Sequence, residues 1–205
     1  MRTLIAGAAA AALAALIGGF WFATRSGPET AFDACRGGSV AGGDAIGGPI
    51  TLVSETGETV TDQDIFTAPT LVYFGYTYCP DVCPYDAARN AEAVDLLAEM
   101  GHEVKSVFIT IDPERDTPEV LQEFTDYMHE DMIGLTGSPA QIDAAAKAYK
   151  TYYEKQDSED EFYLVDHMTF TYLMMPGGAF ADFFRRDVTA DDMATRAACF
   201  IEAAS

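Results

Sequence analysis

The sequence predicts one α/β domain in which a largely parallel sheet is covered by helices on both faces. Runs rich in β-branched and aromatic residues alternate with runs whose apolar positions recur at helical spacing. Short segments containing glycine or proline separate these runs, as expected between strands and helices. The length of 205 residues suits a single domain with an appendage, and 49% hydrophobic with 22% charged residues is typical of a folded chain.

The first predicted elements are a hairpin and a central strand. Ile50–Ser54 and Glu58–Thr61 are short β-prone runs on either side of Glu55-Thr56-Gly57, a pattern that predicts a β-hairpin. Thr70–Tyr76, with the sequence TLVYFGY, is β-branched and aromatic along most of its length. Such a run is typical of a strand that is buried on both faces, so we expect it at the centre of the sheet.

A helix, a strand and a second helix follow the central strand. Pro84–Met100 has apolar residues at helical spacing, and Gly101 predicts the end of that helix. Val104–Ile111 has the composition of a strand. Pro118–Met128 is a helix in which Thr117 is the expected N-cap, directly before a proline at the first helical position.

The alternation continues to the C-terminus. The further predicted elements are a short strand at Ile133–Leu135, a helix from Ser138 to about Tyr152, strands at Thr169–Met175 and Phe180–Phe184, and a helix that begins at Thr189. The two late strands are joined by Pro176-Gly177-Gly178, so we expect a hairpin that closes the sheet.

The N-terminal segment predicts a single transmembrane helix. Thr3–Ala23 carries no charge and includes Phe20-Trp21-Phe22 near its end, a length and composition suited to crossing a bilayer. A cleaved signal peptide is the alternative interpretation of the same run. We therefore expect an anchor at residues 1–25, a Gly-rich linker at 26–45 and one domain at 46–205.

The charge balance excludes some classes of partner. With 12 Lys and Arg against 33 Asp and Glu, the formal net charge is −21. A basic patch that binds nucleic acid or anionic lipid is therefore not expected. The anchor places the acidic domain, by our interpretation, on the far, oxidising side of a membrane.

The strongest chemical motif is Cys79-Pro80-Asp81-Val82-Cys83-Pro84, directly after the central strand. Two cysteines four residues apart at the start of a helix lie on one side, so both sulfur atoms can converge on one point. A helix N-terminus stabilises a thiolate, which favours both metal ligation and thiol–disulfide exchange. Cys79 and Cys83 are therefore candidates for a redox pair and for metal ligands, with an inert or structural pair as the alternative.

The histidines differ in their setting. His102 and His129 lie in polar stretches and are expected at the surface, whereas His167 follows Asp166 at the start of an apolar strand. Strand ends gather at one edge of such a sheet, so His167 can join Cys79 and Cys83 in a metal site.

Two thiolates and one imidazole form a soft set of three ligands. This set suits Cu(I), and Cu(II) with an added oxygen, whereas structural zinc normally takes four protein ligands. Met168, Met174 and Met175 are further soft candidates, although methionines in a strand more often fill the core.

Motifs along the whole domain resemble those of the Sco/SenC family. The resemblance runs from about Ile46 to Phe200 and is carried by GYTYCPDVCP at Gly75–Pro84, IDPERDTPE at Ile111–Glu119, GLTGSP at Gly134–Pro139 and VDHMTFTYLMMPGG at Val165–Gly178. It implies a thioredoxin-like fold with an N-terminal β-hairpin extension, and a single-pass anchor facing the bacterial periplasm or the mitochondrial intermembrane space.

The resemblance also implies a role in assembling the binuclear copper centre of cytochrome c oxidase. The copper ligands would be Cys79, Cys83 and His167, and the partners the copper-binding oxidase subunit and other copper chaperones or thioredoxin-like reductants. Tyr78 departs from the family, because many members have histidine there. That position is not a ligand, so the assignment of the site is unchanged.

Three functions use the same cysteines and remain open. The first is a copper-binding assembly factor without turnover chemistry, and the second is a thiol–disulfide reductase that keeps the cysteines of the oxidase subunit reduced. The CxxxC spacing favours metal, and so does His167 in the region where thioredoxin-type oxidoreductases carry a cis-proline. A peroxidase, the third, lacks a supporting Arg or Thr constellation around Cys79 and Cys83.

Two cysteines lie outside the motif. Cys35 follows the predicted anchor and Cys199 lies in the terminal helix. In an oxidising compartment two remaining thiols often pair, so we expect a bridge between them. A buried Cys199 thiol with a free Cys35 is the alternative.

Overall fold

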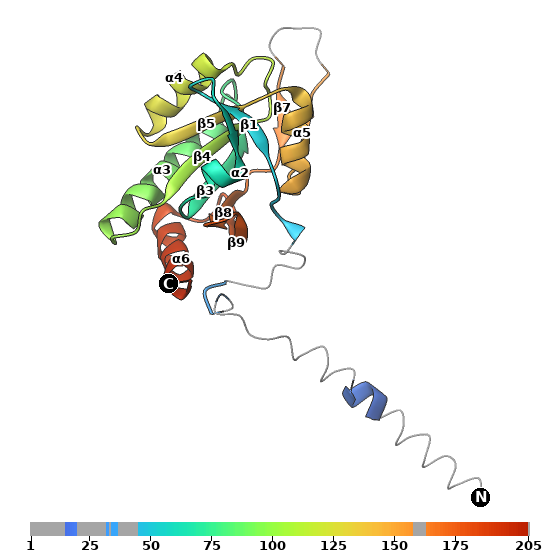
Figure 1. The fold of residues 1–205 in the computed structure, drawn as a ribbon, viewed down its shortest axis with the longest axis vertical. Helices are drawn as coiled ribbons and strands as arrows, with labels where there is room; N and C mark the ends of the chain where they lie inside the picture. Colours follow the sequence, from blue (N-terminus) through green and yellow to red (C-terminus); the bar gives the residue numbers. More distant parts are fainter. Residues whose placement is uncertain (1–14, 20–31, 33, 37–44, 158–162, 205) are drawn as a thin grey trace, which may run out of the picture.

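Most of the domain is described by a computed structural model, which covers residues 15–19, 32, 34–36, 45–157 and 163–204. Among these residues seven strands form one sheet: β1 (Thr51–Ser54), β2 (Thr59–Thr61), β3 (Thr70–Gly75), β4 (Lys105–Thr110), β5 (Met132–Thr136), β8 (Thr171–Met175) and β9 (Ala179–Phe184). The strand order is β2-β1-β5-β4-β3-β8-β9, so β3 and β4 are central, as the composition of Thr70–Tyr76 predicts (Figure 1).

The described helices of the domain cover both faces of this sheet (Figure 1). They are α2 (Asp62–Ile65), α3 (Val82–Glu99), α4 (Pro118–Met128), α5 (Pro139–Ala148) and α6 (Ala190–Ala203). Helix α3 packs against α4 and α6 on one face, and α5 lies on the other. Adjacent residues of β3 show the two sides: the Tyr73 hydroxyl bonds to Asp86 of α3, whereas the Phe74 ring contacts Tyr149, the C-cap of α5.

The sheet is mixed, so the prediction of a largely parallel sheet is wrong. Only β3–β4 and β4–β5 are parallel pairs in the described sheet, and the other four pairs are antiparallel. The β1–β2 and β8–β9 hairpins join strands through short turns, which allow only antiparallel pairing, and they account for two of these four pairs. The predicted hairpins themselves are confirmed, including Gly177 and Gly178 in the second turn with φ of 80° and 82°.

The ends of two helices test the sequence-based boundaries. Gly101 has φ of 88°, and His102 N–H bonds to the Leu97 carbonyl, so the predicted end of α3 is confirmed. Helix α5 ends at Ala148 rather than near Tyr152. Lys150 there adopts φ of 54°, and the Thr151 N–H bonds back to the Ala146 carbonyl, which closes the helix with a left-handed residue other than glycine.

The structure also contains a two-stranded sheet that the sequence does not predict. It consists of β6 (Tyr153–Lys155) and β7 (Val165–His167). Its antiparallel register places Tyr153 opposite His167. His167 therefore lies on this separate ribbon, and β8 begins only at Thr171 rather than at Thr169. Three-residue strands have too little periodicity to be recognised from sequence.

The predicted anchor at residues 1–25 and linker at 26–45 lie for the most part outside the described residues. Within the described ranges, no helix has the length and apolar character required to cross a membrane.

A disulfide joins Cys35 to Cys199, and the predicted bridge is confirmed. The two Cα atoms are 5.6 Å apart, and the half-cystines are separated by 164 residues in sequence. Next to the bridge the Phe32 ring packs edge-on against Phe200 of α6, with 5.3 Å between centroids. The bridge therefore fixes the segment that precedes the domain onto its terminal helix.

Candidate metal centre

The cysteine pair lies where the central strand meets helix α3. Strand β3 ends at Gly75, Cys79 lies in the loop that follows, and Cys83 is in the first turn of α3. The Cys83 backbone N–H donates to Cys79 Sγ at 3.4 Å, as expected for a helix N-terminus that faces a sulfur atom. Cys79 is 7% exposed and Cys83 is fully buried.

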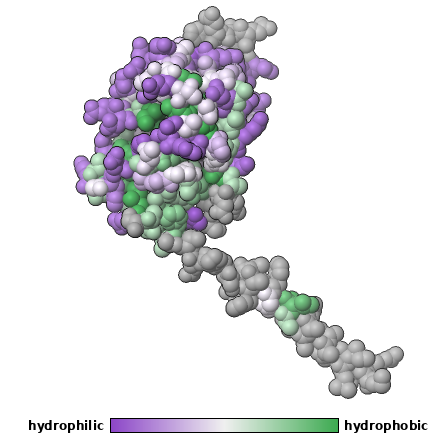
Figure 2. Space-filling view, viewed as in Figure 1, coloured by the Kyte–Doolittle hydropathy of each residue, from purple (hydrophilic) through white to green (hydrophobic). Residues whose placement is uncertain are grey.

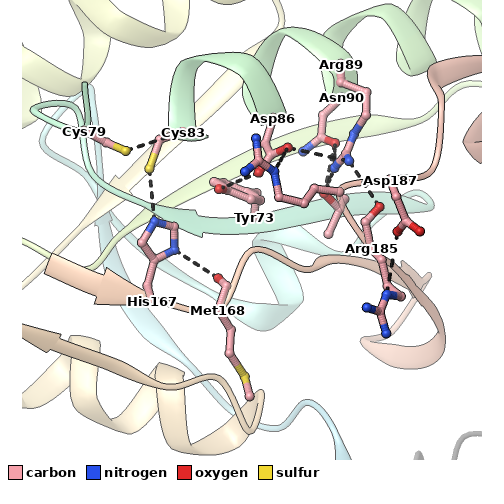
Figure 3. A network of polar contacts seen from close by, with 12 residues as sticks. Tyr73, Cys79, Cys83, Asp86, Arg89, Asn90, His167, Met168, Arg185 and Asp187 are labelled. Atoms are coloured by element: carbon pink, nitrogen blue, oxygen red, sulfur yellow. Dashed lines mark hydrogen bonds and ion pairs between the residues drawn. The ribbon is translucent and has the colours of Figure 1, made fainter. Parts of the chain in front are cut away.

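His167 reaches this site because β8 runs antiparallel to β3. Thr171 at the start of β8 pairs with Tyr73 near the end of β3, so the preceding ribbon lies beside the cysteine loop. His167 Nε2 is 3.3 Å from Cys83 Sγ, and its Nδ1 is 3.0 Å from the Met168 carbonyl (Figure 3). Since a carbonyl only accepts, Nδ1 carries the proton, and the Nε2 lone pair faces the cysteines.

The two sulfur atoms and one imidazole nitrogen form a compact donor set. One ligand atom from each of Cys79, Cys83 and His167 lies within 4.8 Å of the others, so the three side chains could hold one metal ion. This set is soft and fits Cu(I) or Cu(II). The Met168 sulfur is directed away from the cysteines in Figure 3, and Met174 and Met175 are buried in the core, so none of these methionines completes the site.

The two thiols have opposite electrostatic environments. The pKa of Cys79 is lowered to about 3, chiefly by a hydrogen bond from Cys83 and also by the neighbouring His167 and the backbone N–H groups of Asp81 and Cys83, which together outweigh the cost of burial. Burial raises the pKa of Cys83, and so does the neighbouring Cys79. The reduced site therefore holds one thiolate, on Cys79, and one thiol, on Cys83.

This difference gives a prediction for alkylation. Iodoacetamide should modify Cys79 of the reduced protein at nearly the same rate at pH 7 and pH 5, because its thiolate persists down to about pH 3. An ordinary thiol with a pKa of about 8.5 slows roughly tenfold for each pH unit over this range. Peptide mass spectrometry assigns the label. A tenfold fall per unit at Cys79, or faster labelling of Cys83, would contradict the electrostatic description.

A buried carboxylate fixes the loop that carries Cys79. Asp116 is fully buried, and its two carboxylate oxygens accept from the Thr77 N–H at 3.0 Å, the Thr77 hydroxyl at 2.6 Å and the Thr110 hydroxyl at 2.6 Å. Its own carbonyl accepts from the Thr136 hydroxyl at 3.0 Å. Burial raises the pKa of Asp116, and the hydrogen bonds from Thr110 and Thr77 oppose that rise. Asp116 thus connects the ends of β3, β4 and β5 beneath the site.

Arg115 holds the ribbon that carries His167. Its guanidinium carbon is 3.6 Å from the Tyr163 ring centroid and 4.8 Å from that of Tyr78, and it forms an ion pair with Asp112. The Tyr163 hydroxyl also donates to Asp112 at 2.7 Å, which joins the segment before β7 to the loop after β4. Tyr78, the departure from the family pattern, therefore stacks on this arginine and supplies no ligand.

Sequence reasoning did not identify Asp116, Arg115 or Tyr163 as part of the site. The available signal for Arg115 and Asp116 is their position. They lie in Ile111–Glu119, the segment that directly follows the second parallel strand. The prediction of exposed histidines at 102 and 129 is also wrong. Their side chains are 19% and 15% exposed, and His102 lies 3.6 Å from Glu202 while His129 lies 3.2 Å from Asp95. A nearby carboxylate on another element keeps each ring partly covered.

The fold and the cysteine pair define a class of protein, a mixed α/β domain of thioredoxin type with a Cys–Cys–His cluster after its central strand. The SCO1/SenC family model matches residues 39–202, and the chain belongs to this family. The resemblance of the sequence motifs to that family is thereby confirmed.

Individual relatives agree with this assignment. Protein SenC of Rhodobacter capsulatus is 59% identical over 172 residues, which are 84% of this chain and 78% of the relative. The mitochondrial SCO1 homolog 1 of Arabidopsis thaliana is 42% identical over 78% of this chain but only 48% of its own length. The copper-bound crystal structure of Arabidopsis ScoI superposes with a TM-score of 0.74 and 39% identity, covering 77% of this chain and 99% of that one.

Proposed function

We propose that this protein is a copper-binding assembly factor that delivers copper to, or prepares, the binuclear copper centre of cytochrome c oxidase. The observation that carries the proposal is the convergence of Cys79, Cys83 and His167 within 4.8 Å, in a member of a family that includes a copper-bound structure. Copper is the cargo in this function, and the protein supplies the ligands that hold it.

Each residue of the site has a distinct task. Cys79 offers a thiolate at neutral pH, and Cys83 must release its proton as copper binds, so metal uptake is coupled to proton release. His167 offers Nε2 because the Met168 carbonyl holds the proton on Nδ1. Asp116 and Arg115 keep the two ligand-bearing segments at the correct separation.

Thiol–disulfide reduction is the second candidate, and the unequal cysteines favour it. A thiolate on Cys79 is a nucleophile that can attack a disulfide of the oxidase subunit, and the Cys83 thiol lies near enough to resolve the mixed disulfide. The same pair would then serve as a redox pair, so copper binding and reductase activity are alternatives for one site.

The location and partners complete the proposal. Residues 1–25 would anchor the domain in a membrane, with residues 46–205 in the bacterial periplasm or the mitochondrial intermembrane space. The partners would be the copper-binding subunit of the oxidase, other copper chaperones and thioredoxin-like reductants. The net charge of −21 suits docking to positively charged surfaces, and hydrophilic side chains cover much of the face in Figure 2.

An anaerobic copper titration of the reduced protein tests the proposal, and one tight equivalent is expected. Replacing His167 with alanine should weaken Cu(II) binding more than Cu(I) binding, because two thiolates alone can hold Cu(I) linearly whereas Cu(II) also requires nitrogen or oxygen ligands. Competition with chelators of each ion measures the two affinities. Full Cu(II) affinity in His167→Ala would remove this histidine from the site, and failure of the wild type to bind copper would refute the function.

A further inference from the structure

A buried charged network begins beside the candidate metal centre and follows α3 away from it (Figure 3). Asp86 lies three residues after Cys83, on the same side of the helix, and is fully buried. Its Oδ2 accepts a hydrogen bond of 3.0 Å from the Tyr73 hydroxyl. The Tyr73 ring meets the imidazole of His167 edge-on, with 6.2 Å between centroids. One oxygen of the Asp86 carboxylate is therefore connected to the site through a single side chain, that of Tyr73.

The other oxygen of Asp86 faces two arginines. Oδ1 is 3.6 Å from Arg89 Nη1 and 3.8 Å from Arg186 Nε, and within the described residues it has no hydrogen-bond partner. Arg89 is held in place by the Arg185 carbonyl at 3.2 Å and the Thr171 hydroxyl at 3.0 Å. Figure 3 shows Arg89 farther along α3 than Asp86, so the carboxylate is nearer to the cysteines than this arginine is.

The network costs stability and has no part in copper ligation. A buried carboxylate with one oxygen lacking a hydrogen bond is unfavourable unless a nearby cation compensates. Burial raises the pKa of Asp86, and Arg89 and the Tyr73 hydroxyl oppose that rise. A hydrophobic side chain in the same space between α3 and the sheet would cost less folding free energy, so packing alone does not explain why this residue is charged.

We propose that Asp86 sets the redox preference of the Cys79–Cys83–His167 site. Reduction of a Cys79–Cys83 disulfide breaks the S–S bond and takes up two electrons and one proton, leaving a thiolate on Cys79 and a thiol on Cys83. Reduction of bound Cu(II) to Cu(I) takes up one electron. Both reactions add negative charge beside a fixed carboxylate, so Asp86 disfavours both, while Arg186 acts in the opposite sense. The copper part of this inference rests on the proposed function.

The first test uses the metal-free full chain and a glutathione redox buffer at pH 7, in which two glutathione molecules supply the electrons and become one disulfide. Asp86→Asn keeps the shape and removes the charge, so it should shift the equilibrium about tenfold toward the reduced pair, or about 30 mV for two electrons. Arg186→Gln should shift it toward the disulfide, by less because its side chain is 43% exposed. Peptide mapping separates this pair from Cys35–Cys199.

Arg185→Gln is the matched control, since it removes the same charge next to Arg186 but from a side chain that is 72% exposed and paired with Asp187. Its equilibrium should stay within twofold of the wild type. A purely structural role of the network would give shifts of the same sign in Asp86→Asn and Arg186→Gln. Equal signs, or an unchanged equilibrium in Asp86→Asn with the thermal midpoint preserved, would overturn the proposal.

The second test is the ratio of Cu(II) to Cu(I) affinity. Asp86→Asn should lower this ratio about tenfold, because Cu(II) carries the larger charge. If the wild type binds no copper, the proposed function fails, while the glutathione equilibrium still decides the role of Asp86. If copper binds normally and neither the ratio nor the glutathione equilibrium moves, the role of Asp86 fails and the function stands.

Discussion

Replacing Cys83 with alanine is expected to abolish tight copper binding, and Cys79→Ala is expected to do the same. Structural zinc sites with four thiolate or imidazole ligands bind with about 10–16 kcal/mol, or about 3 kcal/mol per ligand, and a loss of this size for copper is roughly a hundredfold or more in affinity. A single remaining thiolate then cannot hold copper against competing thiols. Competition with a Cu(I) chelator under anaerobic conditions measures the loss.

Met168→Ala is the matched control for the cysteine variants. Met168 is the neighbour of His167, is 40% exposed and carries a soft sulfur atom that is directed away from the site in Figure 3. Its removal should leave copper affinity unchanged within a factor of about three. Tight copper binding by Cys83→Ala would show that the ion lies elsewhere, and a large loss in Met168→Ala would show that the donor set changes when the metal binds.

Removing the Cys35–Cys199 bridge should lower the free energy of unfolding by up to about 5 kcal/mol. The bridge spans 164 residues, and the chain-entropy model assigns about this value to the freedom gained by an unfolded chain without such a link. Urea unfolding of Cys35→Ala/Cys199→Ala against the wild type measures the loss. Copper binding to the folded variant should be unchanged, because neither cysteine belongs to the site.

The reduced state supplies the control for this prediction. Dithiothreitol should lower the urea midpoint of the wild type and of Cys79→Ala/Cys83→Ala by similar amounts, since both retain the bridge when oxidised. It should leave the midpoint of Cys35→Ala/Cys199→Ala almost unchanged. A midpoint of the wild type that does not respond to dithiothreitol would show that the bridge adds little to stability.

Local patterns were sufficient for much of this fold. Thr70–Tyr76 is recognisable as the central strand because a run buried on both faces is apolar along most of its length. Thr117 and Ser138 are recognisable as helix starts, and each accepts a hydrogen bond from the backbone N–H three residues later. Such signals depend on residues within one turn of each other, so they can be read from the sequence without knowledge of the rest of the fold.

Whether two strands pair in the parallel or the antiparallel direction is harder to predict from the sequence. Each hairpin is recognisable from its turn residues, but the alternation of strands and helices predicts more parallel pairs than the sheet contains. Strand β1 pairs with β5, and Val53 lies opposite Thr136, although the two strands are distant in sequence. Pairing of this kind depends on which edge of the sheet remains free, a property of the assembled domain.

The sequence by itself determined the cysteine pair, because Cys79 and Cys83 are four residues apart where a strand meets a helix, and it added His167 through its place at the start of an apolar strand and through the family motifs. Only the tertiary structure decided that His167 Nε2 lies 3.3 Å from Cys83, that Asp116 joins three strand ends, and that Asp86 is buried between Tyr73 and two arginines. These contacts join segments far apart in the chain. Their energies come from burial, where unpaired polar groups are costly, and burial exists only once the sheet and its helices have packed.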